Sequence, residues 1–454
     1  MENIPIYLLI GIIIISIAIY YSSQKTIIRN SILLLTSFFL YIYLEGLQIS
    51  ILFFIILITY IFSKQLIKHP NRLVLGISIF IVLIFLILYK YIFVINSELR
   101  IEKLPIGLSF YTFQSISYLV DSYHRKTKKD QTIIEIGIYL AFFPKILAGP
   151  LENGNSFIQQ LRNRKTFKKS TAFTSLKIII WALCCKFVFA DSLGMIVNNH
   201  LTEYQTLSPS AIISTSLLYS FQILCDFYSY SIFAIGIALL YGINLSANFN
   251  YPYFSASFKD FWKKWNITLT SWLREYIYIP LGGNKVSFIR WSLNIFIVFI
   301  LSGIWHGASF NFILWGFLHG LCYWIESASI KLISNHLFIK KLFKQLYAFI
   351  VFIIISFLWL IFRIEDFEVL KMLLVRVLIH FSFESIPFYD FLLVFVFSFG
   401  VIMLKRLQII ETYIFRTQNH SCFIIKEVGL INIILFLLIF FAKNGNSNFI
   451  YFNY

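Results

Sequence analysis

Residues 301–320 read LSGIWHGASFNFILWGFLHG, and His306 follows Trp305 near the start of this stretch. Apolar runs at 288–304 and 309–326 flank the histidine and are about as long as a membrane-crossing helix must be. We therefore expect this imidazole at membrane depth, where an ionisable side chain is costly and marks a functional site by default. The alternative is a histidine that only hydrogen-bonds a neighbouring helix. Position alone does not separate the two interpretations.

The composition indicates an integral membrane protein with many spans. The chain has 454 residues, of which 59% are hydrophobic and only 13% are charged. Soluble domains are nearer half apolar and a quarter charged. The net charge of +17 is compatible with nucleic-acid binding, but the basic residues fall in short loops between apolar runs. That distribution fits cytoplasmic loops, so we expect a membrane protein and no nucleic-acid partner.

The cysteines and the other buried ionisable residues do not predict a metal site. The five cysteines show no CxxC spacing, which excludes the common zinc and redox motifs. His319 lies thirteen residues after His306, and a pair of ligands on one helix face would be four apart. We expect His319 to have a structural or supporting role. Asp226, inside an apolar run, is expected to be a buried hydrogen-bonding acid, with catalysis as the alternative.

The order of apolar runs predicts an all-α polytopic fold of about eleven transmembrane or re-entrant helices. The first run lacks the basic start and cleavage site of a signal peptide, so we expect it to be retained. No repeat or composition break divides the chain, and a single domain is expected over 1–454, with N-terminal helices in 1–100 and a catalytic region in 101–454. The predicted runs are 5–22, 31–44, 48–62, 73–95, 173–190, 210–243, 288–304, 309–326, 345–362, 389–404 and 428–442.

Charge bias gives an orientation for the loops. We expect the basic clusters at 125–129, 162–169 and 331–344 in the cytoplasm, because cytoplasmic loops carry the excess of Lys and Arg. The loop predicted at 191–209 has neither residue and is expected outside.

Two segments carry more polar residues than lipid-facing helices would. The stretch after Leu104 includes Ser109, Thr112 and Gln114, which should face protein or a wet cavity. Residues 133–150 contain two prolines and lie between two basic clusters. This pattern predicts a re-entrant element that lines a cavity or is buried, and the alternative is an ordinary kinked helix.

Residues 258–276 show aromatic residues at helical spacing and basic residues elsewhere on the helical wheel. The pattern predicts an amphipathic helix at the membrane interface. Asn266 lies at the edge of its apolar arc, beside Trp262 and Trp265. Its amide either completes a packing contact or points into a site.

Three long blocks and four shorter matches carry a family likeness. The blocks are LPIGLSFYTFQSISYLVD (104–121), FKDFWKKWNITLTSWLREYIYIPLGGN (258–284) and SGIWHGASFNFILWGFLHG (302–320). The shorter matches are FFPKILAGP (142–150), NFNYPYFS (248–255), FLWLIFR (357–363) and FIYFNY (449–454). Together they resemble the alginate O-acetyltransferase branch of the membrane-bound O-acyltransferase (MBOAT) superfamily. The YIPLGGN run favours this branch over the teichoic acid D-alanylating branch.

The resemblance implies an enzyme with helices around a central tunnel, in the bacterial cytoplasmic (inner) membrane. Such an enzyme takes an acyl group from a cytoplasmic donor and passes it outward. The family's catalytic histidine corresponds to His306. Many bacterial relatives have histidine where this chain has Asn266, although distant members use asparagine there. A further departure lies at Ser229 and Ile232, where relatives usually have glycine and aspartate.

We therefore expect a membrane O-acetyltransferase with His306 and Asn266 converging in its catalytic site. A neutral imidazole suits the removal of a hydroxyl proton near pH 7. The expected donor is acetyl-coenzyme A (acetyl-CoA), and no bound cofactor is predicted. The basic groups near 259–285 are expected to orient the chain, with contact to the phosphates of coenzyme A as a further role. Expected partners are membrane lipid, an extracytoplasmic polysaccharide and a secreted or periplasmic acetyltransferase. Alternatives are acylation of peptidoglycan, teichoic acid or a carrier protein, or a transporter or flippase.

Overall fold

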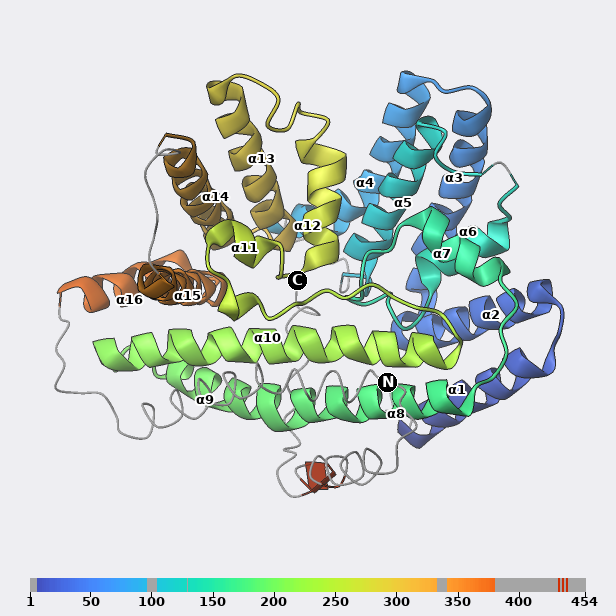
Figure 1. The fold of residues 1–454 in the computed structure, drawn as a ribbon, viewed down its shortest axis with the longest axis horizontal. Coiled ribbons are helices and arrows are strands. Elements are labelled where there is room, and N and C mark those ends of the chain that lie inside the picture. The colour runs from blue at the N-terminus through green and yellow to red at the C-terminus, as the bar shows by residue number, and fades with distance from the viewer. Residues whose placement is uncertain are drawn as a thin grey trace. The chain divides into compact units, whose positions relative to one another are not determined.

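A computed structural model describes residues 6–95, 104–128, 130–332 and 341–379, together with 432, 435, 436, 438 and 439. Every regular element in these residues is a helix, which confirms the all-α prediction (Figure 1). Contacts group the chain into two compact units. Unit 1 is Met1–Ile179 with Ser231–Ala247, and unit 2 is Ile180–Tyr230 with Asn248–Tyr454. The expected single domain with a boundary near residue 100 stays a prediction.

Unit 1 contains the N-terminal helices. They are α1 (Ile6–Ser22), α2 (Thr26–Glu45), the 3-10 turn η1 (Gly46–Gln48), α3 (Ile49–Lys68), α4 (Arg72–Ile95), α5 (Leu108–Tyr123), α6 (Ile133–Ala141) and α7 (Gly154–Arg162). Most of α8 (Lys169–Cys184) and the last part of α10 (Pro209–Leu240) also belong to it.

Unit 2 begins within α8 and includes most of α10. Its other elements are η2 (Cys185–Ala190), α9 (Asp191–Thr202), η3 (Pro252–Phe254), α11 (Phe258–Trp262), α12 (Ile267–Leu273), η4 (Arg274–Tyr278), α13 (Phe288–His306), α14 (Phe310–Leu332), α15 (Lys341–Arg363) and α16 (Phe367–Ile379). The two π-helical turns, η2 and η4, continue the helices that precede them.

Six helical stretches among the described residues are long and apolar enough to cross a membrane. They cover 26–68, 72–91, 169–202, 209–240, 288–306 and 345–363. The predicted run 389–404, most of 428–442 and the block 449–454 lie outside the described residues, as does much of the basic loop 331–344. The count of about eleven elements therefore stays a prediction.

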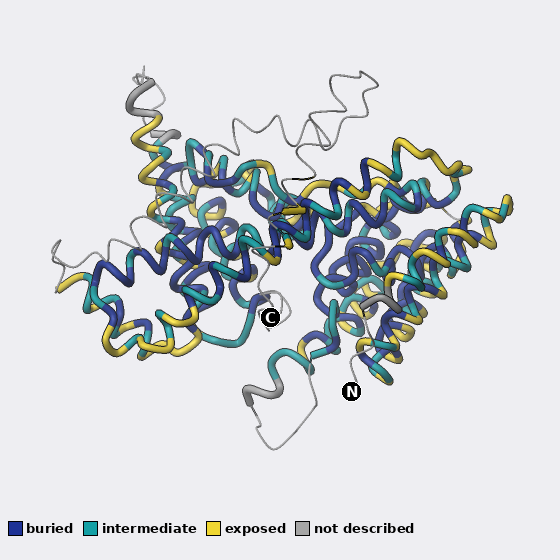
Figure 2. Tube along the Cα trace, turned by 90° about the horizontal axis from the view of Figure 1, so that it is seen from below, coloured by how far each residue is buried: buried dark blue, intermediate teal, exposed yellow. Residues whose placement is uncertain are grey.

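Helix α5 is buried along almost its whole length, as its polar residues predicted. Along the trace, buried and exposed residues alternate on many of the helices (Figure 2). Ser109, Thr112 and Gln114 are all at most 5% exposed. The hydroxyl of Ser115 lies 2.6 Å from that of Thr59 on α3, so a hydrogen bond joins the two helices. By contrast, α4 exposes a row of large apolar side chains, which is the kind of surface that lipid solvates.

The segment 133–150 is not one helix. Helix α6 has 9 residues, about 14 Å at 1.5 Å per residue, and cannot cross a hydrocarbon core of about 30 Å. Turns follow, and Lys145 within them is 1% exposed, with its ammonium donating to the Tyr139 carbonyl at 2.7 Å. The irregular backbone is therefore buried in protein. Its re-entrant course stays a prediction.

The predicted loop at 191–209 is wrong over most of its length. Helix α9 occupies Asp191–Thr202 and continues directly from η2. Leu193 and Val197, one helical turn apart, are fully buried, and no proline interrupts residues 191–208. An apolar stripe without a helix breaker favours continuation of the helix. The absence of Lys and Arg predicts orientation, but it does not predict a loop.

Candidate functional site

His306 is the last residue of α13 and is 4% exposed. Four aromatic rings surround its imidazole. The ring centroids lie 4.5 Å from Trp305, 4.8 Å from Phe362, 5.2 Å from Trp315 and 6.3 Å from Phe312. Such an apolar enclosure keeps bulk water from the imidazole.

Close packing of α13 against α14 fixes the position of His306. A side chain at Gly303 of α13 would collide with the carbonyl oxygen of Phe312, and one at Gly316 of α14 would collide with that of Phe299. Small residues at such helix–helix contacts let two backbones approach closely in membranes. The histidine thus lies at the end of a rigid helix pair, as the flanking apolar runs predicted.

His319, on α14, lies in the same aromatic cluster and is fully buried. Its ring contacts Trp315 at 4.8 Å and Trp262 at 5.0 Å. Neither ring nitrogen has a hydrogen-bond partner among the described residues. The indole N–H groups of Trp262, Trp315 and Trp359 are also buried, and no described residue accepts a hydrogen bond from them. Native proteins rarely leave several such groups unsatisfied, and a bound molecule is one way to satisfy them.

Asn266 breaks the helix that was predicted over 258–276. The segment folds as α11, a turn, α12 and η4, and Asn266 in the turn has a φ of 42°. Asparagine is one of the few residues that tolerate this left-handed conformation. The amide of Ile267 then donates to the Asn248 carbonyl at 2.9 Å, and the Thr268 hydroxyl donates to the Asn248 side chain at 2.6 Å. The continuous amphipathic helix is therefore wrong, because a neighbouring loop takes over its hydrogen bonds.

A chain of rings connects the two predicted site residues. Asn266 is 3% exposed and follows Trp265, whose ring lies 4.7 Å from that of Trp359. Trp359 lies 5.7 Å from Trp315, which contacts His306. Both predicted residues are thus buried in one aromatic cluster of unit 2. Their convergence on a single reacting group, and their catalytic roles, stay predictions.

The sequence motifs alone do not predict a buried charge cluster in unit 2. The Lys186 ammonium lies 2.7 Å from the Asp226 carboxylate and 2.9 Å from that of Asp191, and all three residues are at most 6% exposed. Asp226 was expected to be a buried hydrogen-bonding acid, and the structure gives it a salt bridge. Lys186 inside the apolar run 173–190 was the available signal, because intramembrane charges pair with one another.

Comparison with known proteins identifies the family to which this chain belongs. The family model described as "MBOAT, membrane-bound O-acyltransferase family" matches residues 38–364. The chain therefore belongs to the membrane-bound O-acyltransferase family. This confirms the predicted resemblance and, with the six apolar helices, an integral polytopic membrane protein.

Named relatives carry related activities. The probable alginate O-acetylase AlgI of Pseudomonas aeruginosa is 36% identical over 266 residues, which are 59% of this chain and 50% of the relative. The peptidoglycan O-acetyltransferase of Helicobacter pylori is 32% identical over 292 residues, 58% of this chain and 55% of the relative. A teichoic acid D-alanyltransferase of Bacillus subtilis is 25% identical over 232 residues, 48% of this chain and 58% of the relative. The chain thus aligns with about half the length of these relatives.

Proposed function

We propose that this protein is a membrane O-acetyltransferase that passes acetyl from cytoplasmic acetyl-CoA to an extracytoplasmic polysaccharide, with His306 as the catalytic base. The observation that carries the proposal is the placement of His306, sealed by four aromatic rings at the end of the rigid α13–α14 pair. Membership of an acyltransferase family and the names of the relatives at 32–36% identity support it.

The proposed reaction is an ordinary acyl transfer. The imidazole of His306 removes the proton of the acceptor hydroxyl as its oxygen attacks the thioester carbonyl carbon. The carbonyl becomes an oxyanion, which then collapses and expels the coenzyme A thiolate. The thiolate takes the proton from the imidazolium, so the histidine is regenerated. The products are an acetyl ester and free coenzyme A.

The unsatisfied donors near His306 suit the oxyanion. Preorganised N–H groups directed at a developing negative charge are a large source of catalytic rate. The indole N–H of Trp315, on a residue whose ring touches His306, is one such donor. The amide of Asn266 is a second candidate, and its role is to orient the imidazole or to bind the thioester oxygen.

The acceptor and its route are further parts of the proposal. We favour a polysaccharide in the manner of the alginate relative, and peptidoglycan is the alternative that the Helicobacter relative supports. A secreted or periplasmic acetyltransferase is proposed to receive or pass on the acetyl group. The bacterial source of the relatives supports placement in the cytoplasmic membrane.

Reconstitution into liposomes tests the proposal. The purified chain is given acetyl-CoA on one side and a polysaccharide or peptidoglycan fragment on the other. We expect release of the coenzyme A thiol together with an alkali-labile acetyl ester on the acceptor. A chain that transports a solute but neither hydrolyses nor transfers acetyl would instead establish the transporter alternative. Ester formation only on peptidoglycan would correct the acceptor.

A further inference from the structure

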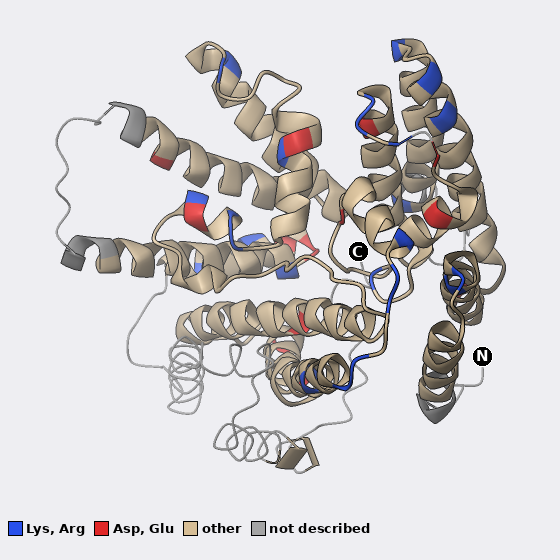
Figure 3. Cartoon of the chain, turned by 45° about the vertical axis from the view of Figure 1, so that its right-hand side comes forward, with Lys and Arg blue, Asp and Glu red and all other residues tan. Residues whose placement is uncertain are grey.

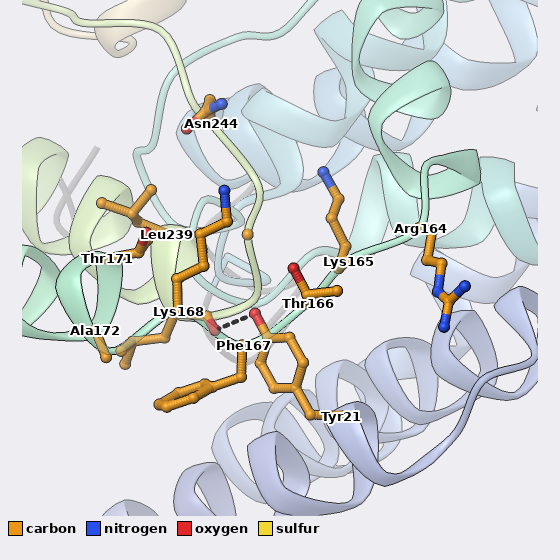
Figure 4. A pocket seen from close by; sticks show the side chains of 12 residues that line it. Tyr21, Arg164, Lys165, Thr166, Phe167, Lys168, Thr171, Ala172, Leu239 and Asn244 are labelled. Atoms are coloured by element: carbon orange, nitrogen blue, oxygen red, sulfur yellow. Dashed lines mark hydrogen bonds between the residues drawn. The ribbon is translucent and has the colours of Figure 1, made fainter.

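Unit 1 contains a cavity of 290 Å³ that the acyl-transfer proposal does not use (Figure 4). Its walls come from the end of α1, from the segment 164–168, from the first turn of α8 and from the end of α10 with the loop that follows. The lining combines basic, hydroxyl-bearing and apolar side chains.

The charge of this cavity is entirely positive. Arg164, Lys165 and Lys168 line it, and none of its twelve lining residues is acidic (Figure 4). Among the described residues, no carboxylate forms a salt bridge with any of the three. Figure 3 shows blue stretches along the segment that connects α7 to α8. Arg162, in the same basic cluster, differs because it is paired with Glu135 and Asp130. Three unpaired cations around a cavity favour an anionic occupant.

Hydrogen bonds hold the walls of the cavity in place. Tyr21 donates from its hydroxyl to the Leu240 carbonyl at 3.0 Å, which joins α1 to α10. Arg29 donates to the Lys165 carbonyl at 2.8 Å and so fixes the backbone of the basic segment. Gly242 has a φ of +70°, and a side chain there would come within 3.2 Å of the Lys165 side chain. The site is therefore preformed.

The cavity lies where three apolar helices end. Helix α1 ends at Ser22, α8 begins at Lys169 and α10 ends at Leu240. Stretches 169–202 and 209–240 are membrane spans by length and composition, and 10–22 is a shorter apolar helix. Apolar helices of a membrane protein leave the hydrocarbon layer near their ends, at the level of the lipid phosphates. Basic pockets between helices at that level bind anionic headgroups.

We propose that this cavity binds the phosphate of an anionic membrane lipid. The guanidinium of Arg164 offers paired N–H donors to two phosphate oxygens, and the ammonium groups of Lys165 and Lys168 supply compact positive charge. The hydroxyls of Thr166 and Thr171 are further donors in the lining, and Phe167 offers an apolar surface for the glycerol and acyl chains. This assignment does not depend on acyl transfer.

The test measures lipid retained by the purified full chain. Detergent-solubilised protein is equilibrated with phosphatidylglycerol or with phosphatidylcholine, and bound lipid is counted by native mass spectrometry. We expect wild type to retain phosphatidylglycerol in preference to phosphatidylcholine. The double variant Arg164→Gln/Lys168→Gln should bind it roughly 30-fold more weakly, at about 1 kcal/mol for each basic residue.

Two further variants distinguish a site from general surface charge. Lys68→Gln/Arg72→Gln removes two exposed cations elsewhere in unit 1 and should leave retention unchanged. Ala172→Phe fills the cavity without altering its charge and should reduce retention. Equal retention by wild type, the Arg164/Lys168 variant and the Ala172 variant would overturn the proposal.

Competition separates the two sources of phosphate. Inorganic phosphate and coenzyme A are each added to protein loaded with phosphatidylglycerol. We expect neither competitor to displace the lipid from the wild-type protein. Displacement by coenzyme A, with binding that requires Arg164 and Lys168, would show instead that the cavity is a soluble-phosphate site and would overturn the lipid assignment.

Discussion

The indole of Trp315 stands edge-on to the imidazole of His306, with ring centroids 5.2 Å apart and planes at 88°. The same indole contacts His319 at 4.8 Å. One residue of α14 therefore separates two buried histidines, and its N–H is unsatisfied among the described residues. Substitution of His306 therefore tests whether this imidazole is the base.

His306→Gln should abolish acetyl transfer, because glutamine keeps polarity and similar bulk but cannot accept the hydroxyl proton. We expect a loss of roughly 10²–10⁴-fold, the usual contribution of a general base. Coenzyme A release in liposomes measures it, with His124→Gln, at an exposed histidine of unit 1, as the matched control. Full activity in the His306 variant, with normal accumulation of the protein, would refute the mechanism.

Three substitutions at Asn266 distinguish the role of its side-chain amide from the role of its backbone conformation. Asn266→Gly removes the amide and accepts the φ of 42°, whereas Asn266→Ala also strains the backbone by about 1–2 kcal/mol. If the amide acts in the site, both should lose activity, and only the alanine variant should also lose thermal stability. Asn266→His should retain activity, since related enzymes are expected to carry histidine there. A fully active glycine variant would leave the asparagine with a structural role alone.

Lys186→Met should destabilise the protein strongly, because Asp226 and Asp191 would lose their shared cation. Removing one partner of a buried ion pair costs about 3–5 kcal/mol. The double variant Lys186→Met/Asp226→Leu should recover part of this loss, and thermal unfolding in detergent measures both. If the double variant unfolds at a lower temperature than the single variant, the pairing is not what stabilises this region.

The salt bridges of Arg162 with Glu135 and Asp130 predict that unit 1 is destabilised by acid. Burial alone would raise the pKa of Glu135, but hydrogen bonds from Arg162 and the Thr132 amide lower it overall. Arg162 likewise lowers the pKa of Asp130. A carboxyl whose pKa is lowered by folding stabilises the native state at pH values above its unfolded pKa, which is 4.5 for Glu135 and 3.8 for Asp130. That stabilisation is lost as the pH falls through the lower pKa of the folded state.

Thermal unfolding as a function of pH measures this effect. Wild type should lose stability progressively below about pH 4.5, and Arg162→Gln should flatten that dependence while lowering stability at neutral pH by roughly 1.5–3 kcal/mol. Replacing the exposed Arg72 by glutamine is the control for charge. An unchanged acid profile in the Arg162 variant would show that other carboxyls control acid unfolding.

Substituting glycine by alanine should change the stability of the protein in opposite directions in α13 and α4. Gly303→Ala forces a methyl group against the Phe312 carbonyl and should destabilise the protein by about 1–3 kcal/mol. Gly76→Ala, in α4, meets nothing within 4 Å and should stabilise it by about 0.5–1 kcal/mol through helix propensity. Equal effects of both on the unfolding temperature would contradict the close packing of α13 on α14.

The sequence was sufficient for features that depend on local periodicity. Apolar runs predicted most of the long helices, and the hydroxyl and amide groups of α5 predicted its burial. The position of His306 between two apolar runs predicted a buried imidazole, and the family blocks predicted the family that the comparison confirmed.

What the sequence did not predict depends on partners distant in the chain. The break at Asn266 arises because Asn248 accepts hydrogen bonds that a continuous helix would have kept for itself. The salt bridge of Lys186 requires Asp226, forty residues away. Helical periodicity cannot register either, since both are decided by tertiary contacts.

The buried cluster of Lys186, Asp191 and Asp226 also bears on how the chain enters a membrane. A lone charged residue at the centre of an inserting helix costs about 2.5–3.5 kcal/mol. Asp226 is the only charged residue of the stretch 209–240, and its cation, Lys186, lies on the stretch 169–202. A connection of only a few residues joins the two stretches. Biogenesis is therefore easiest when the two stretches leave the translocon together as a helical hairpin, with the ion pair already formed before lipid surrounds it.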